Sequence, residues 1–244
     1  MDGFSIDLVI FLIATFAGAL VAGLSGFAFA LVAASIWLYI LPPLQVVTLI
    51  IAFGLIVQGY MVWKLRHALD WRRLWPFVAG AAIGVPVGVA ILGWANPAYV
   101  RAGIGVFLVL YSLYALLRPS LPPVTQGGAA ADAAVGFANG VLGGITGLAG
   151  ILVTIWCGLR GWPKDKQRAV FQPVAVAIFA MSALWLGVNG AVSADTIRLF
   201  LFGLPALLAG TWFGMKLYGR LDEAAFRKVV LILLLASGVA LMFR

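Results

Sequence analysis

The sequence predicts an all-α polytopic membrane protein of two inverted-topology repeats, each with about five helical elements including a short or broken helix pair. Three observations favour this class: the composition, a set of long apolar stretches, and a series of glycines and charges that occurs twice. Of the 244 residues, 64% are hydrophobic and 10% are charged. A soluble domain is about 45–50% apolar and about 25% charged. A soluble core of this length could not bury such an excess, so lipid is the expected solvent.

The long apolar stretches define the expected membrane spans. A hydrocarbon core of about 30 Å takes roughly 20 residues of α-helix. Stretches of about this length cover residues 6–24, 46–63, 74–94, 99–117, 170–188, 199–217 and 229–242. This many apolar stretches leaves almost no room for a soluble domain.

The second half of the chain repeats the first. Residues 16–26 align with residues 137–147, and Gly84 and Gly88 align with Gly210 and Gly214. The offset between aligned positions drifts only from 121 to 126. We therefore expect a first membrane repeat over 1–118, a linker over 119–131 that is rich in proline and glycine, and a second repeat over 132–244.

The basic residues predict that the two repeats are inverted. The loop at 64–73 is basic, whereas its counterpart at 187–196 has no basic residue. The turn at 41–45 is uncharged, whereas its counterpart at 160–168 is strongly basic. Short loops rich in Lys and Arg stay cytoplasmic, so both termini are expected on the extracytoplasmic side. The net charge of +8 is then an orientation signal, and because no basic stripe is interleaved with stacking aromatics, no nucleic-acid partner is expected.

A candidate binding site lies where each half has a short second element, at about 28–41 and 149–160. In inverted-repeat carriers, sites form near the midplane at interrupted helices. Each short element follows a glycine–hydroxyl–glycine stretch, and these stretches contain Gly23, Ser25 and Gly26 in the first half and Gly144, Thr146 and Gly147 in the second. Amides at the following helix start attract anions, and the hydroxyls add donors. We expect both stretches to meet on one small anion; the alternative is that the glycines only allow close helix packing.

Three further polar residues are candidates for the same site. Gln172 follows Arg168 by one helical turn and precedes Pro173, so the two side chains share a face at an expected kink. Arg168 is also explained by cytoplasmic anchoring. Asn139 stands where the first half has Gly18, and its alternative role is a hydrogen bond between helices. The tryptophans at 63, 71, 75, 94 and 162 flank loops and are interpreted as interface anchors.

Several function classes are not supported by the sequence. The acidic residues Asp7, Asp132 and Asp195 lie near the ends of apolar stretches, whereas proton pumps and cation carriers usually keep a carboxylate deep in the membrane. The chain has no Ser-His-Asp arrangement, metal-ligand cluster or phosphate-binding loop. We expect no enzyme activity, no metal and no cofactor; the expected partners are the lipid bilayer and a small anionic substrate.

The glycine stretches and their flanks resemble the sulfite exporter TauE/SafE family. The resemblance is carried by residues 23–33, the Leu-Pro-Pro at 41–43 and the loop at 70–74, and in the second half by 143–150 and 159–164. It implies a permease in a bacterial inner membrane for sulfite, sulfoacetate or another organosulfonate. The function expected is therefore secondary transport of such an anion by alternating access. An anion channel and a membrane scaffold without substrate remain alternatives.

Overall fold

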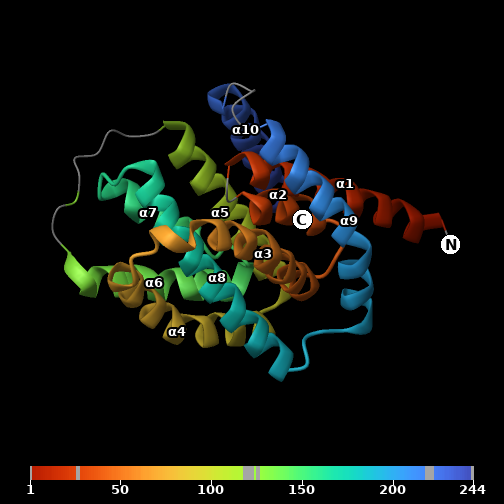
Figure 1. Cartoon of the computed structure of the whole chain (residues 1–244). Helices are drawn as coiled ribbons and strands as arrows, with labels where there is room; N and C mark the ends of the chain where they lie inside the picture. Colours follow the sequence, from red (N-terminus) through yellow and green to blue (C-terminus); the bar gives the residue numbers. More distant parts are fainter. Residues whose placement is uncertain (1, 26–27, 118–123, 125–126, 218–222, 243–244) are drawn as a thin grey trace. The chain divides into compact units, whose positions relative to one another are not determined.

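The computed structural model describes residues 2–25, 28–117, 124, 127–217 and 223–242. All regular secondary structure in these residues is helical (Figure 1). It contains ten α-helices and one short 3-10 turn, and no strand occurs among these residues. The prediction of an all-α fold is confirmed. Gly26 lies outside the described residues, and the side chain of Ser25 is likewise not described.

The helices follow the predicted order. The first predicted repeat contributes α1 (Asp2–Ser25), α2 (Phe29–Trp37), α3 (Pro43–Leu65), α4 (Trp71–Trp94) and α5 (Pro97–Leu117). The second contributes α6 (Gly128–Thr146), α7 (Ile151–Leu159), α8 (Lys164–Val188), α9 (Ala194–Leu217) and α10 (Glu223–Met242). Helix α6 already begins at Gly128, inside the segment predicted as linker, because an alanine-rich run follows that glycine and favours helix.

Helix length separates spanning elements from short ones. Helices α1, α3, α4, α5, α8 and α9 are long and apolar enough to cross a membrane, and the chain is an integral membrane protein. Helices α2 and α7 have nine residues each, which at 1.5 Å per residue is about 14 Å and less than half of a hydrocarbon core of about 30 Å. A short second helix in each half was predicted and is confirmed.

Local sequence explains where several helices begin. Pro43 and Pro97 occupy the first positions of α3 and α5, where a missing N–H costs nothing. Asn96 caps α5, since its Oδ1 accepts a hydrogen bond from the Ala98 N–H at 2.9 Å. Ser193 caps α9 in the same way, through the Thr196 N–H at 3.2 Å.

The helices form two compact units, and each unit takes helices from both predicted repeats. One unit comprises residues 1–53, 95–119 and 193–244; the other comprises residues 54–94 and 120–192. The first unit thus contains α1, α2, α5, α9 and α10, and the second contains α4, α6, α7 and α8. The two compact units therefore do not coincide with the two predicted sequence repeats.

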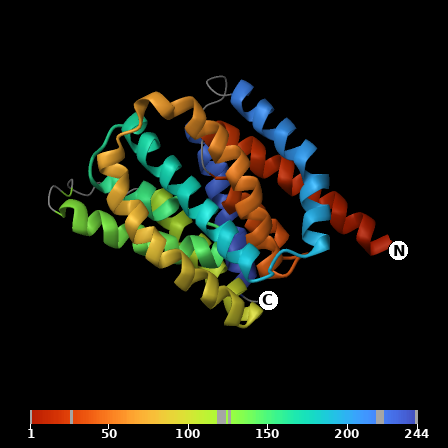
Figure 2. The same cartoon turned by 60° about the horizontal axis from the view of Figure 1, so that its bottom comes forward.

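In the second unit, α4 and α6 lie side by side (Figure 2), and their backbones are in direct contact. A Cβ atom added at Gly84 would collide with the carbonyl oxygen of Phe137, and one at Gly88 would collide with that of Val141. From the other side, a Cβ at Gly140 would lie 2.8 Å from the Ala81 oxygen. Glycine on both helices permits this backbone-to-backbone contact, as is typical of membrane helix pairs.

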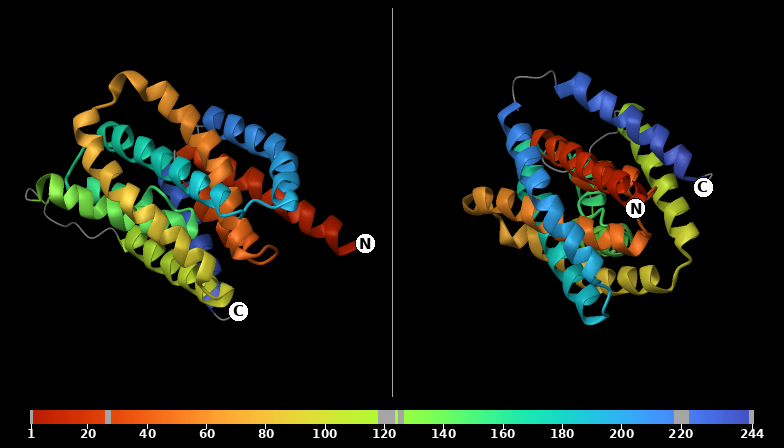
Figure 3. Two further views of the ribbon diagram at one scale, coloured as in Figure 1. Left: turned by 90° about the horizontal axis from the view of Figure 1, so that it is seen from below. Right: turned by 90° about the vertical axis from the view of Figure 1, so that its right-hand side faces the viewer.

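In the first unit, α1 and α9 pack in the corresponding way. A Cβ at Gly210 would collide with the Phe16 carbonyl oxygen, and one at Gly214 would collide with that of Leu20. These positions align with Gly84, Gly88, Phe137 and Val141 in the predicted repeat. In the same unit α5 runs beside α10 (Figure 3, right), where Gly105 faces the backbone of Gly238.

Helices α1 and α2 form a hairpin in the first unit. The Phe11 and Trp37 rings are stacked with centroids 4.8 Å apart, and the Trp37 indole N–H donates to the Phe11 carbonyl oxygen at 3.4 Å. Phe29 and Phe53 complete an aromatic cluster around Trp37. The residues of this cluster are buried, so the hairpin is held together by apolar packing.

Candidate functional site

The turn between α6 and α7 is the described part of the predicted site. Helix α6 ends at Thr146, and Gly147 follows with a left-handed backbone, φ 74°. The Gly147 N–H donates to the Gly143 carbonyl oxygen at 2.8 Å. Glycine is favoured at this position because a Cβ destabilises left-handed backbone. The turn then reaches Gly150, which precedes the first residue of α7, Ile151.

Asn139 holds this turn against the start of α7. Its side chain is fully buried. The amide Nδ2 donates to the Ala149 carbonyl oxygen, and Oδ1 accepts from the Leu152 N–H at 3.1 Å. The amide therefore satisfies one of the N–H groups that every helix start leaves without a partner inside the helix. In the structure Asn139 makes the hydrogen bond between helices that the sequence offered as its alternative role, and it acts as a positioning residue.

The hydroxyl of Thr146 is also engaged locally. It donates to the Leu142 carbonyl oxygen at 2.7 Å and accepts from the Leu148 N–H at 3.1 Å. The residue is 5% exposed. Because the hydroxyl hydrogen is committed to Leu142, Thr146 stabilises the end of α6 and the turn after it. An anion at this turn would therefore accept hydrogen bonds from backbone N–H groups and not from the Thr146 hydroxyl.

Gly23 and Gly144 face other helices within their own units. A Cβ at Gly144 would lie 2.9 Å from the Val85 oxygen of α4, and one at Gly23 would lie 2.7 Å from the Thr211 oxygen of α9. Close helix packing therefore accounts for glycine at both positions. Through this packing Gly144 fixes where the turn after α6 begins.

Helix α8 borders the α6–α7 turn. A Cβ at Gly150 would have its nearest neighbours on α8, the Ala175 Cβ at 3.7 Å and a Phe171 ring carbon at 3.9 Å. Gln172 is 2% exposed on the same stretch of α8, and Arg168 is half-buried one turn earlier. The second unit thus gathers Asn139, Thr146 and Gly147 with the segment of α8 that carries Gln172. The Gly23–Gly26 stretch belongs to the first unit.

The opposite end of the α6–α7 hairpin carries a largely buried ion pair. Asp132, near the start of α6, is 8% exposed. One carboxylate oxygen accepts from the Trp156 indole N–H at 2.7 Å, and the other lies 3.5 Å from Nη2 of Arg160. The Arg160 guanidinium also lies 5.6 Å from the Trp156 ring centroid. The start of α6 and the end of α7 are therefore joined, and the two helices form a closed hairpin.

Comparison with protein-family models gives one match that covers nearly the whole chain. Residues 10–241 match the model of the family described as sulfite exporter TauE/SafE. The chain belongs to the sulfite exporter TauE/SafE family. The resemblance seen in the glycine stretches is confirmed, and membership of TauE/SafE implies a membrane transporter of sulfur-containing anions. Neither the search of curated proteins nor that of solved structures found a match.

The pair of Asp132 and Arg160 in this TauE/SafE protein was not predicted from the sequence. Asp132 was noted as an acidic residue near a helix end, and Arg160 as part of a basic loop. One signal was available: with the offset of 121, Asp132 aligns with the aromatic Phe11. Trp156 lies four residues before Arg160, on the same face of a helix. An ionisable residue that replaces a buried aromatic in a repeat indicates a new polar contact.

Proposed function

We propose that this TauE/SafE protein is a secondary transporter that moves a small sulfur-containing anion, such as sulfite, sulfoacetate or another organosulfonate, by alternating access. The anion binds at the start of α7, and the observation that supports this most directly is the hydrogen bonding of Asn139 to both sides of that helix start. The bacterial inner membrane and the extracytoplasmic position of both termini are part of the same proposal, and they rest on the family and on the basic loops.

The start of α7 has the chemistry that an oxyanion needs. The first turn of any helix has N–H groups without intrahelical partners, and they attract anions together with the positive end of the helix dipole. Asn139 uses only the N–H of Leu152. Gly150 contributes no side chain in front of the remaining amides. Gln172 supplies a side-chain amide and Arg168 a positive charge from α8, which borders the turn.

The first unit differs from the second at this position, and the difference favours α7 over α2. With the offset of 121, Asn139 and Gly150 align with Gly18 and Phe29. A Cβ at Gly18 would lie 3.2 Å from the Phe29 ring, and Phe29 is 4% exposed. The start of α2 is thus occupied by an aromatic ring, whereas the start of α7 carries a polar amide and a glycine. Gly23, Ser25 and Gly26 stay in the proposed set as the equivalent stretch of the first repeat.

The α6–α7 hairpin is re-entrant in this proposal. Helix α7 is about 14 Å long and cannot cross the hydrocarbon core alone. Its far end contacts the start of α6 through Asp132 and Arg160. A hairpin with joined ends enters and leaves by the same face and places its turn at membrane depth. Irregular backbone at that depth is tolerated where it packs against protein or lines a cavity, and both conditions suit a binding site.

Uptake of radiolabelled sulfite and sulfoacetate into proteoliposomes tests this function with a matched pair of variants. A Cβ at Gly150 would make only ordinary contacts, the nearest at 3.7 Å, so Gly150→Ala should fold while placing a methyl group over the helix start. We expect its uptake rate at low substrate to fall by about 10-fold, the loss of roughly one good hydrogen bond to a charged group.

Gly158→Ala is the control, because this position is in the same short helix and a Cβ there has nothing within 4 Å. It should transport at the parental rate. Equal uptake by the two variants would move the binding site away from the start of α7. Absence of saturable uptake in folded parental protein would contradict the proposed substrate class.

A further inference from the structure

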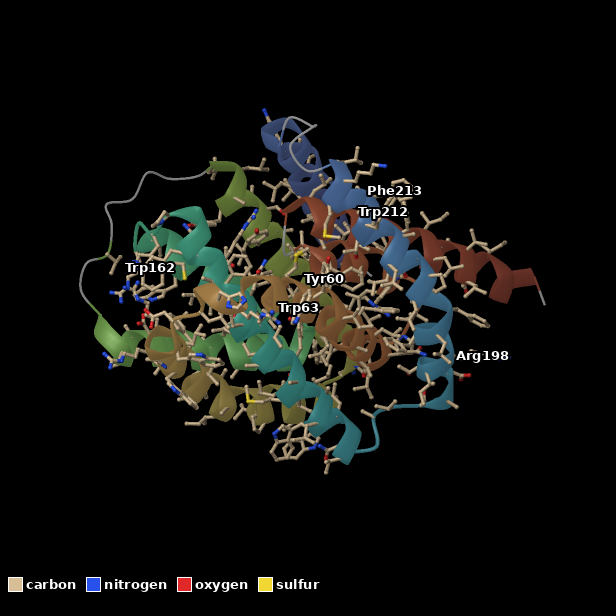
Figure 4. The ribbon with its side chains drawn as sticks, in the orientation of Figure 1. Tyr60, Trp63, Trp162, Arg198, Trp212 and Phe213 are labelled. Carbon is tan, nitrogen blue, oxygen red and sulfur yellow. The ribbon has the colours of Figure 1, made fainter. Side chains whose placement is uncertain are left out.

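Trp162 differs from the other loop tryptophans. Trp63, Trp71 and Trp94 are 59%, 64% and 91% exposed, as expected of residues that anchor a helix in the membrane interface. Trp162 is only partly exposed, and nitrogen-bearing side chains gather around it (Figure 4). Three cationic groups lie close to its ring centroid: Arg73 at 5.5 Å, Arg160 at 5.7 Å and Lys166 at 5.6 Å.

These three side chains come from three different elements of one unit. Arg73 lies in the first turn of α4, Arg160 follows α7, and Lys166 lies in the first turn of α8. Because all three lie near one ring centre, no two of the charges can be more than roughly 11 Å apart, about the Debye length of 8–10 Å at physiological salt. The charges therefore act together. We refer to Arg73, Arg160, Lys166 and Trp162 as the Trp162 cluster.

Carboxylates compensate the Trp162 cluster only in part. Asp70 pairs with Arg73 at 2.8 Å, but both side chains are exposed, at 51% and 41%. Asp132 lies 3.5 Å from Arg160 and also accepts from Trp156. Within the described residues, Lys166 makes no ion pair, and Nε of Arg160 is buried without an acceptor.

The Arg160 Nε–H is a buried donor without an acceptor among the described residues and lies in a cluster with two further cations, Arg73 and Lys166. This combination indicates that the cluster binds an anion. Buried donors are normally satisfied, and like charges held within roughly 11 Å of one another repel unless a counter-charge joins them. An aromatic face attracts each cation but supplies no net negative charge. An oxyanion beside the Trp162 ring would neutralise the excess positive charge of the cluster.

We propose that the Trp162 cluster is a docking site for a small oxyanion and that it receives the transported anion at the basic, cytoplasmic end of this unit. The inference that this site receives the transported anion rests on the proposed function. The inference that the cluster binds an oxyanion does not. A sulfonate or sulfite group presents several oxygens on one centre, which suits the guanidinium forks of the arginines and the point charge of the lysine. The phosphate of an anionic lipid headgroup has the same chemistry, so the test must separate the two sources.

Anion binding to the purified full-length chain in lipid-free detergent tests the site. Inorganic sulfate and methanesulfonate are titrated at constant ionic strength against chloride, and the shift in melting temperature gives an apparent Kd, because a ligand of the native state stabilises it in proportion to occupancy. The variants Arg73→Gln and Lys166→Gln each remove one cation without stranding a buried carboxylate. Each should raise the apparent Kd by about 3- to 10-fold, as expected for the loss of one charge at short range.

Two control variants remove a cation of the same kind elsewhere. Arg66 lies 5.1 Å from the Trp63 ring centroid, and Lys216 lies 4.9 Å from that of Trp212; Figure 4 labels both tryptophans. Arg66→Gln and Lys216→Gln should leave the apparent Kd unchanged. Equal effects in all four variants, or no saturable shift in the parent, would overturn the proposal.

A lipid arm separates the two sources of oxyanion. The same variants are compared in phosphatidylcholine bilayers with and without phosphatidylglycerol. Stabilisation of the parent by phosphatidylglycerol that Lys166→Gln abolishes, together with no response to sulfate or methanesulfonate, would assign a headgroup site and overturn the docking role. Saturable anion binding in a chain that shows no uptake would keep the site and remove the proposed function. If Arg73→Gln and Lys166→Gln both keep the uptake kinetics and the anion binding of the parent, the Trp162 cluster is not the docking site, and the proposed transport function is unaffected.

Discussion

Replacement of Asn139 tests whether its side-chain amide stabilises the α6–α7 turn. The replacement Asn139→Leu keeps the number and branching of the side-chain heavy atoms, so it opens no cavity. It removes both hydrogen bonds of the amide, one from the Leu152 N–H at 3.1 Å and one to the Ala149 carbonyl oxygen. Because the side chain is fully buried, water cannot replace either partner.

The magnitude follows from the two groups that lose their partners. A buried backbone donor or acceptor left unsatisfied costs about 1–3 kcal/mol, so the free energy of unfolding should fall by roughly 2–5 kcal/mol. For a chain of this size about 1 kcal/mol corresponds to roughly 2–4 °C in Tm, which predicts a decrease of roughly 4–20 °C. The measurement is thermal unfolding in detergent at one fixed scan rate, since membrane proteins often unfold irreversibly.

Asn189→Leu is the matched control for this prediction. Asn189 also donates from Nδ2 to a backbone carbonyl oxygen, that of Trp185 at 2.7 Å, but it is exposed at the end of α8. Its replacement should change stability by no more than about 0.5 kcal/mol. A Tm for Asn139→Leu as close to the parent as that of the control would show that the turn does not depend on this amide.

Three further predictions test the packing, the topology and the electrostatics. Gly84→Ala should greatly reduce the yield of folded protein, because its Cβ collides with the Phe137 carbonyl oxygen, whereas Gly103→Ala, with nothing within 4 Å, should express as the parent does; size-exclusion profiles in detergent decide this. Cysteines introduced into the 64–73 and 187–196 loops of a cysteine-free background should react with an impermeant maleimide from opposite sides, and labelling from one side would contradict the inverted topology. The KM for sulfite uptake should rise with ionic strength between about 0.05 and 0.5 M, because salt screens the attraction of the anion to the basic loops at 64–73 and 160–168. A KM that does not change with salt would exclude a steering role for those charges.

The glycine positions show how far sequence reasoning reaches in this protein. The alignment of Gly84 and Gly88 with Gly210 and Gly214 pointed to equivalent roles, and in the structure each pair faces the carbonyl oxygens of an adjoining helix. The short helices could also be predicted, because helix length against bilayer thickness is a matter of counting residues. These features depend on local composition, and local composition can be read directly from a sequence.

The roles of individual polar side chains could not be read in that way. Thr146 and Asn139 were candidates for direct contact with an anion, but both bind nearby backbone in the structure. In an apolar helix a polar side chain takes the closest available partner, and that partner depends on how the chain turns after the helix. The pairing of Asp132 with Arg160 spans a whole hairpin, so no spacing rule for a single helix indicated it.

Counterflow distinguishes carrier-mediated movement of a small sulfur-containing anion from passive flux through a channel. Proteoliposomes are preloaded with unlabelled sulfite and diluted into a trace of radiolabelled sulfite, and the internal label is followed with time. We expect a transient accumulation of label above the external concentration, because an alternating-access carrier exchanges bound anions across the membrane. Label that only equilibrates, at a rate that does not saturate with sulfite, would contradict a carrier and indicate a channel.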